Sequence, residues 1–132
     1  MSIDTTLAPG SRGVALVVDD DEDVQIFVVM ALERLGFAVK TAGDGMEALE
    51  MCQNEVFDLV MCDMRMPRLS GISFLKNVRI RAPLSAKRVV FLTSVDDTSV
   101  KRESIAAGAQ DYLVKPITTA RLAAVVNKVF GT

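Results

Sequence analysis

The sequence predicts a single α/β domain in which helices cover both faces of a parallel β-sheet. Short valine-rich runs, typical of strands buried on both faces, alternate with segments whose apolar residues recur at helical spacing. Five such pairs follow one another, as parallel strands joined by right-handed helical crossovers require. The 132 residues, half of them apolar, suit one domain with one core.

The first two strand and helix pairs are marked by changes of apolar period and by residues that start or stop helices. A continuous apolar run predicts the first strand at residues 14–18. An apolar stripe at helical spacing follows, and Gly36 ends that helix. The stripe consists of Val24, Phe27, Val28, Ala31, Leu32 and Leu35. Residues 38–41 are expected to form the second strand, and Asp44 with Glu47 three residues later predicts the start of the second helix.

The remaining elements continue the same alternation. Ser70 can cap a third helix that ends before Pro83, and Gly108 stops a weakly amphipathic fourth helix. Val100 and Ile105 are the large apolar anchors of that fourth helix. The expected ranges are 59–62, 88–93 and 112–114 for the strands and about 98–107 for the fourth helix, with Leu122, Val125, Val126 and Val129 marking the fifth.

Polar residues stand at the carboxyl ends of four of these strands. In the flavodoxin-like, doubly wound strand order 2-1-3-4-5, ligands bind beyond those ends, where the strand order reverses. Asp19 and Asp20 follow the first strand and Asp63 follows the third, and these two strands flank the reversal. Thr93 ends the fourth strand and Lys115 the fifth. Three carboxylates, a hydroxyl and an amine are therefore expected at one edge of the sheet.

The run of acids from Asp19 to Asp23 predicts a bound cation. Two unit charges about 4 Å apart repel by roughly 4 kcal/mol near a protein surface. Asp21, Glu22 and Asp23 are explained by capping of the first helix, whereas Asp19 and Asp20 lie against the sheet, where an unpaired carboxylate is costly. Mg²⁺ suits such a site because it prefers oxygen ligands and is usually held by one or two carboxylates. Three aspartates and one lysine sum to −2, which one Mg²⁺ neutralises.

Four motifs, VVDDD, VMCDMRMPRLSG, FLTS and GAQDYLVKP, make the chain similar to the receiver domains of two-component response regulators, of which single-domain chemotaxis regulators are one kind. The resemblance covers about residues 13–130. It implies Mg²⁺-dependent transfer of a phosphoryl group onto Asp63 from a histidine kinase or a histidine phosphotransfer protein. It also implies that Asp20 binds the metal directly and Asp19 mostly through water, with Asp63 and the backbone carbonyl of Arg65 as further ligands and Mn²⁺ as an alternative metal.

The resemblance further assigns the residues around the phosphoryl group. The Thr93 hydroxyl and the Lys115 amine would bind its oxygens, with Ser94 as the small residue that the family has after the threonine. Tyr112 occupies the position of the aromatic switch residue. The Lys115–Pro116 peptide bond is expected to be cis. Phosphorylation would shift the surface of the fourth helix, fifth strand and fifth helix, which then regulates a downstream protein; the chain would catalyse only its own phosphorylation and dephosphorylation.

Ile26, Val29 and Met30 fall opposite the apolar stripe of the first helix. Exposed together, they suggest a surface on which a phosphodonor docks, as the family implies, although scattered surface hydrophobes explain them equally well. We expect a monomer or a weak, phosphorylation-dependent dimer.

Composition and charge exclude several other classes. The formal charge of −2 provides no basic footprint, so the chain alone is not expected to bind nucleic acid. No secretory signal or bilayer-spanning stretch is present, which predicts a cytoplasmic protein without membrane insertion, made of a flexible tail at residues 1–12 and a receiver domain at 13–132. Cys52 and Cys62 lack metal-ligand spacing and are expected to be buried free thiols. The chain has no histidine, so a phosphohistidine must come from another protein.

Three other functions fit less well. A flavodoxin-like cofactor binder needs a Gly- and hydroxyl-rich loop after the first strand, and here that loop is acidic. A haloacid-dehalogenase-like phosphatase needs a second acid two residues after its nucleophile, where this chain has Arg65. A pseudo-receiver that is never phosphorylated is disfavoured by the intact acid, threonine and lysine set. With no output domain after the last expected helix, a stand-alone receiver and a fragment of a longer regulator both fit.

Overall fold

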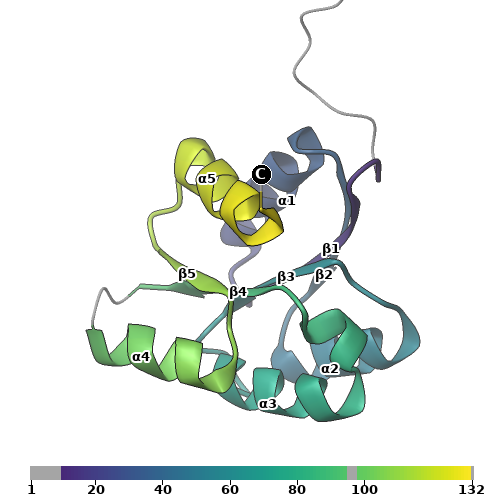
Figure 1. The fold of residues 1–132 in the computed structure, drawn as a ribbon, viewed down its shortest axis with the longest axis vertical. Helices are drawn as coiled ribbons and strands as arrows, with labels where there is room; N and C mark the ends of the chain where they lie inside the picture. The colour runs from purple at the N-terminus through teal and green to yellow at the C-terminus, as the bar shows by residue number, and fades with distance from the viewer. Residues whose placement is uncertain (1–9, 95–97, 132) are drawn as a thin grey trace, which may run out of the picture.

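The computed structural model describes residues 10–94 and 98–131, which form one parallel sheet with helices on both faces (Figure 1). The strands pair in the order β2-β1-β3-β4-β5, and every pairing is parallel. The fold class and strand order expected from the sequence are therefore confirmed. The strands are β1 (Gly13–Val18), β2 (Phe37–Ala42), β3 (Leu59–Asp63), β4 (Val89–Thr93) and β5 (Asp111–Val114).

Helices α1 (Glu22–Arg34) and α5 (Thr119–Phe130) cover one face of the sheet. The other face is covered by α2 (Gly45–Asn54), α3 (Gly71–Arg81) and α4 (Thr98–Ala107), as Figure 1 shows. A short 3₁₀ helix, η1 (Pro83–Ala86), joins α3 to β4 and was not expected from the sequence. No helix among the described residues combines the length and apolarity needed to cross a membrane.

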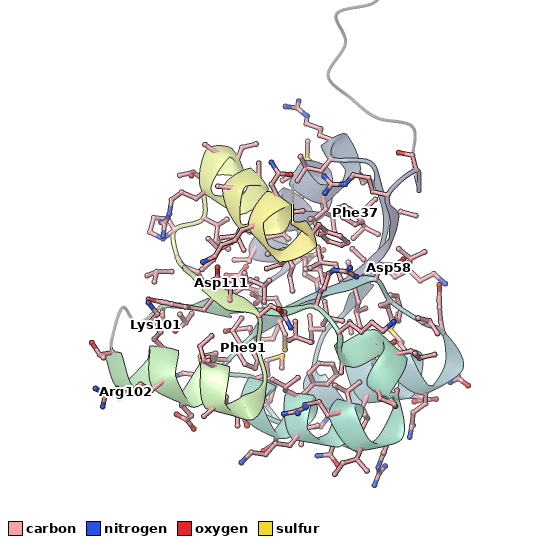
Figure 2. All side chains as sticks on the ribbon, viewed as in Figure 1. Phe37, Asp58, Phe91, Lys101, Arg102 and Asp111 are labelled. Atoms are coloured by element: carbon pink, nitrogen blue, oxygen red, sulfur yellow. The ribbon has the colours of Figure 1, made fainter. Side chains whose placement is uncertain are left out.

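The strands are buried because successive side chains enter different cores. In β1, Ala15 and Val17 pack with α1 and α5, whereas Leu16 and Val18 pack with α2 and α3. This alternation follows from the period of two residues in a strand. Figure 2 shows the same two cores in other strands: Phe37 of β2 lies on the side of α1 and α5, and Phe91 of β4 lies on the opposite side. The continuous apolar runs in the sequence are thus explained by a sheet covered on both faces.

The expected helix starts carry the expected caps. The Asp21 carboxylate accepts hydrogen bonds from the backbone N–H groups of Asp23 and Val24, and the Ser70 hydroxyl accepts one from the third residue of α3. Asp44 caps α2 by accepting from the Glu47 backbone N–H. Each cap satisfies N–H groups that a helix leaves without partners in its first turn.

Two expectations about helix faces are wrong. Ile105 of α4 is 48% exposed, and the buried residues of that helix are Ser104 and Ala107. On α1, Phe27 is 39% exposed and lines a surface pocket beside α5, whereas Val29 packs against the core. Helical spacing predicts the centre of a buried stripe, but the burial of its flanks depends on which neighbouring helix lies beside them.

The first strand, β1, begins at Gly13. Of the tail expected at residues 1–12, residues 1–9 lie outside the described residues. The backbone N–H of Arg12 donates to the Gly36 carbonyl oxygen. The Arg12 guanidinium lies over the rings of Phe37 and Phe130, 5.1 and 5.4 Å from their centroids. Arg12 thus connects the start of β1 to α1, β2 and α5. Cys52 and Cys62 are both buried and free, as expected.

Candidate functional site

Strand register brings the predicted site residues to one edge of the sheet. Val18 lies opposite Cys62, so Asp19 and Asp63, which follow them, leave adjacent strands at the same level. On the far side of β3, the Lys115 backbone N–H donates to the carbonyl of Thr93 at 2.7 Å. In-register parallel strands therefore assemble residues that are up to 96 positions apart in the chain.

The three aspartates form a compact cluster. One carboxylate oxygen from each of Asp19, Asp20 and Asp63 lies within 4.8 Å of the others. Asp19 is fully buried and Asp63 is 8% exposed, whereas Asp20 is exposed. The cluster therefore has a protein-facing side and one side open to solvent, through which a small ion and a phosphoryl group can enter.

Lys115 bridges the two more buried acids. Its Nζ lies 3.1 Å from Asp19 Oδ2, to which it donates a hydrogen bond, and 3.5 Å from Asp63 Oδ2. The Lys115–Pro116 peptide bond is cis, the isomer that the family resemblance implies. One lysine neutralises one of the three negative charges, so the cluster retains a net charge of −2.

The environment of Asp63 disfavours its ionised form in the absence of a cation. Burial raises the pKa of the Asp63 carboxyl, and the negative charge of Asp19 raises it further, against the opposing effects of the Arg65 backbone N–H and of Lys115. Burial by itself would lower the pKa of Lys115, but its hydrogen bond to Asp19 and the charge of Asp63 outweigh burial, and the pKa is raised. Lys115 is therefore charged at neutral pH, and a divalent cation would remove the penalty on Asp63.

The loop after β3 is held close to Asp63. The Arg65 backbone N–H donates to Asp63 Oδ1 at 3.3 Å, and the Arg65 side chain is exposed. The Gly71 N–H donates to the Met64 carbonyl at 3.0 Å, and a Cβ on Gly71 would lie 2.6 Å from the Asp63 carbonyl oxygen. Any other residue at position 71 would push the loop away from the site, a constraint that sequence reasoning did not identify.

A second contact fixes the same loop from the side of α2. Arg68 has a φ of 69°, a conformation that is unfavourable for a residue with a Cβ, and its guanidinium donates to Asp44 Oδ2 at 2.7 Å. The pKa of Asp44 is lowered, first by this hydrogen bond and then by that from the Glu47 backbone N–H. The cap of α2 and the loop after Asp63 are thereby linked, although the two residues are 24 positions apart.

The predicted phosphoryl-binding residues lie at the ends of β4 and β5, whereas the predicted switch residue Tyr112 lies near the start of β5. Thr93 is buried at the end of β4, and Ser94 follows it at the surface. Tyr112 lies in β5, opposite Phe91 of β4. It is half-buried and packs against the core that α2 and α3 cover. The surface formed by β5 and α5 contains a pocket that Tyr112 and Arg121 help to line.

These residues fit a hard divalent cation. Carboxylate oxygens are the ligands that Mg²⁺ prefers, and the three that converge here, together with Lys115, carry a net charge of −2 that one such ion neutralises. The pKa of Asp63 is raised by burial and by the charge of Asp19, and perturbed pKa values of this kind are common at functional sites.

A profile of the response regulator receiver domain matches residues 15–127. The chain belongs to the response regulator receiver domain family. Membership of this family supports a role in phosphoacceptor signalling.

Relatives of two lengths match the chain. It is 32% identical over 117 residues to the probable chemotaxis protein CheY of Rhizobium etli, covering 88% of this chain and 91% of that protein. It is 37% identical over 113 residues to the transcriptional regulatory protein ZraR of Escherichia coli, covering 86% of this chain but only 25% of ZraR. The chain thus spans a quarter of the length of this longer relative.

Solved structures agree with this assignment. The chemotaxis response regulator CheY4 of Vibrio cholerae superimposes with a TM-score of 0.82 at 33% identity, covering 94% of this chain and 99% of CheY4. The receiver domain of the sensor histidine kinase PA1611 of Pseudomonas aeruginosa superimposes with a TM-score of 0.77 at 26% identity, covering 91% of this chain and 99% of that domain. That structure contains a magnesium ion coordinated in its active-site cleft.

Proposed function

We propose that this receiver domain takes a phosphoryl group from the phosphohistidine of a histidine kinase or histidine phosphotransfer protein onto Asp63, with Mg²⁺ or Mn²⁺ as the cofactor. The observation that carries the proposal is the convergence of Asp19, Asp20 and Asp63 within 4.8 Å, with Lys115 beside two of them. A carboxylate that lies beside a lysine amine, can share a divalent cation with two other carboxylates and is open to solvent on one side is suited to act as a nucleophile toward phosphorus.

The reaction would use each residue in a defined way. An Asp63 carboxylate oxygen forms a bond to phosphorus while the bond from phosphorus to the donor imidazole nitrogen breaks, and the electron pair returns to the imidazole. Asp20, Asp63 and the Arg65 carbonyl would hold the metal directly and Asp19 mostly through water, and the metal would neutralise charge on the transferring oxygens. Lys115 and Thr93 bind the remaining phosphoryl oxygens, with the Lys115 amine already beside Asp63. Hydrolysis at the same site would return the domain to its resting state.

The output would be read on the surface formed by α4, β5 and α5. Phosphorylation adds a charge of about −1.5 to −2 and strong acceptor oxygens near Thr93, for which the threonine hydroxyl is a donor. Movement of Thr93 would make space for the half-buried Tyr112 ring. Helix α4 resists displacement weakly, because its buried residues are only Ser104 and Ala107.

The phosphodonor would dock on α1. Ile26 and Met30 are 53% and 55% exposed, and Phe27 lines pockets on the side of the helix that faces Lys115, Pro116 and α5. An apolar surface next to the acceptor site is suited to a protein partner. A downstream protein as target, a cytoplasmic location and a monomer or weak phosphorylation-dependent dimer complete the proposal.

The test is the intact mass after incubation with acetyl phosphate and Mg²⁺. A single phosphate adduct is expected for the wild type and for Asp111→Asn, a matched control at the opposite end of the sheet, labelled in Figure 2. Asp63→Asn should form no adduct, and chelation of the metal should abolish the adduct of the wild type. An adduct that survives Asp63→Asn, or that forms equally well in chelator, would contradict the proposal.

A further inference from the structure

Gln25, on the first turn of α1, connects three elements beside the acid cluster. Its side-chain Nε2 donates to the carbonyl oxygen of Asp19 at 2.6 Å and to that of Ala42 at 3.0 Å. Asp19 directly follows β1, and Ala42 is the last residue of β2. One amide group therefore joins α1 to the carboxyl ends of two adjacent strands, at the edge of the sheet where the aspartates lie.

The turn from Asp19 to Asp21 is held at several other points. The Asp19 N–H donates to the Ala42 carbonyl at 3.2 Å, and the Asp21 N–H donates to Asp19 Oδ1 at 2.9 Å. Lys115 binds the other oxygen of the Asp19 carboxylate. The carbonyl of Asp19 is the remaining polar group of that residue, and it accepts the hydrogen bond from Gln25. The Gln25 amide thus completes the set of bonds that orients the peptide between Asp19 and Asp20.

The direction of the Asp20 side chain depends on this peptide. Asp20 is exposed, and a carboxylate oxygen of Asp20 nevertheless lies within 4.8 Å of carboxylate oxygens of Asp19 and Asp63. In the absence of a cation, these negative charges repel one another. Such repulsion favours rotamers that turn the carboxylate toward solvent, and a fixed backbone restricts which rotamers are open to it. The bonds on either side of Asp20, to the Asp19 carbonyl and from the Asp21 N–H, fix that backbone.

We infer that Gln25 is a positioning residue for the cation site: its amide holds the turn after β1 so that Asp20 stays directed at Asp63. The inference rests on the proposed function for the identity of the cation, but the contacts of Gln25 are independent of it. Groups that orient metal ligands from outside the coordination shell commonly change metal affinity by about ten- to a hundredfold when they are removed.

The test replaces Gln25 by residues of similar length that cannot donate to the two carbonyls. Gln25→Met preserves helix propensity and net charge while removing both hydrogen bonds. Gln25→Glu preserves the shape and adds a negative charge, which on electrostatic grounds alone would tighten Mg²⁺ binding. Gln53→Met is the matched control, because Gln53 is an exposed glutamine on α2, across the sheet.

Mg²⁺ affinity is measured by calorimetric titration at a temperature where circular dichroism shows every variant fully folded. We expect both Gln25 variants to bind Mg²⁺ about tenfold more weakly than the wild type and Gln53→Met to match the wild type. The phosphorylation rate from acetyl phosphate should be restored at saturating Mg²⁺, because positioning changes the metal dependence and not the nucleophile. Unchanged affinity in Gln25→Met, or tighter binding in Gln25→Glu, would overturn the inference.

A second readout uses metal-free protein and separates this inference from the proposed function. Hydrogen exchange of the Asp19 and Asp21 amides, measured by NMR in chelator, should be at least several-fold faster in Gln25→Met than in wild type. Equal exchange rates would show that Gln25 does not hold the turn, whichever ion binds. A wild type that binds no Mg²⁺ would contradict the proposed function, whereas the exchange rates would still decide the role of Gln25.

Discussion

Replacing the acceptor aspartate by asparagine is expected to stabilise the metal-free protein. Asp63 lies within 4.8 Å of the carboxylate oxygens of Asp19 and Asp20 and 3.5 Å from Lys115 Nζ. At an effective dielectric constant near 20, each repulsion costs at least about 3.5 kcal/mol and the attraction to Lys115 contributes about 4.7 kcal/mol. Two repulsions minus one attraction leave about 2 kcal/mol of net repulsion on the Asp63 charge. Asparagine removes this repulsion and keeps an oxygen for the Arg65 N–H.

The expected gain is smaller than this sum because solvent screens the exposed Asp20. We expect Asp63→Asn to increase the free energy of unfolding by about 1–2 kcal/mol in chelator, which raises Tm by about 4–8 °C for a domain of this size. Mg²⁺ should raise the Tm of the wild type by mass action and that of the variant much less. Asp111→Asn is the control, since the Asp111 carboxylate lies 3.1 Å from Lys128 and gains nothing from losing its charge.

The gain should also depend on pH with a defined sign. The pKa of Asp63 is raised in the folded protein above its ordinary value of 3.8, so the protonated carboxyl contributes stability below that value and this contribution is lost as pH rises through the folded-state pKa. The advantage of Asp63→Asn is therefore largest at neutral pH and shrinks on acidification. Thermal unfolding followed by circular dichroism in chelator measures both effects. A variant less stable than wild type at neutral pH, or a difference that grows in acid, would contradict net repulsion on the Asp63 charge.

The remaining predictions concern the relay, the docking surface and a buried thiol. Thr93→Ala should still accept phosphate at Asp63, but beryllofluoride should no longer shift the amide NMR signals of α4 and β5; shifts equal to those of wild type would mean another relay. Ile26→Glu combined with Met30→Glu should slow phosphorylation by a kinase and leave that by acetyl phosphate unchanged, and an unchanged kinase rate would exclude this surface. Burial raises the pKa of Cys52 to about 11, so Ellman's reagent at neutral pH should label it only after unfolding, and rapid native labelling would contradict its burial.

Local sequence patterns predicted the five strands and five helices and the strand ends that carry the candidate site residues. The valine-rich runs, the helical stripes and the caps at Asp21, Asp44 and Ser70 act within a few residues, so they predict strands and helix starts without knowledge of the rest of the chain. Because carboxyl ends of parallel strands share one edge, the order of the elements also brought Asp63 and Lys115 to the same site.

Only the tertiary structure decided the distances and the surroundings of those residues. The position of Lys115 between Asp19 and Asp63, and with it the raised pKa of Asp63, depends on strand register and burial, which no local pattern encodes. The same holds for the exposure of Ile105, because the flank of a helix is buried by whichever neighbour packs there. No sequence pattern singled out Gln25. Its proposed role arises only because the fold brings the ends of β1 and β2 together, so that the carbonyl oxygens of Asp19 and Ala42 both accept from its side chain.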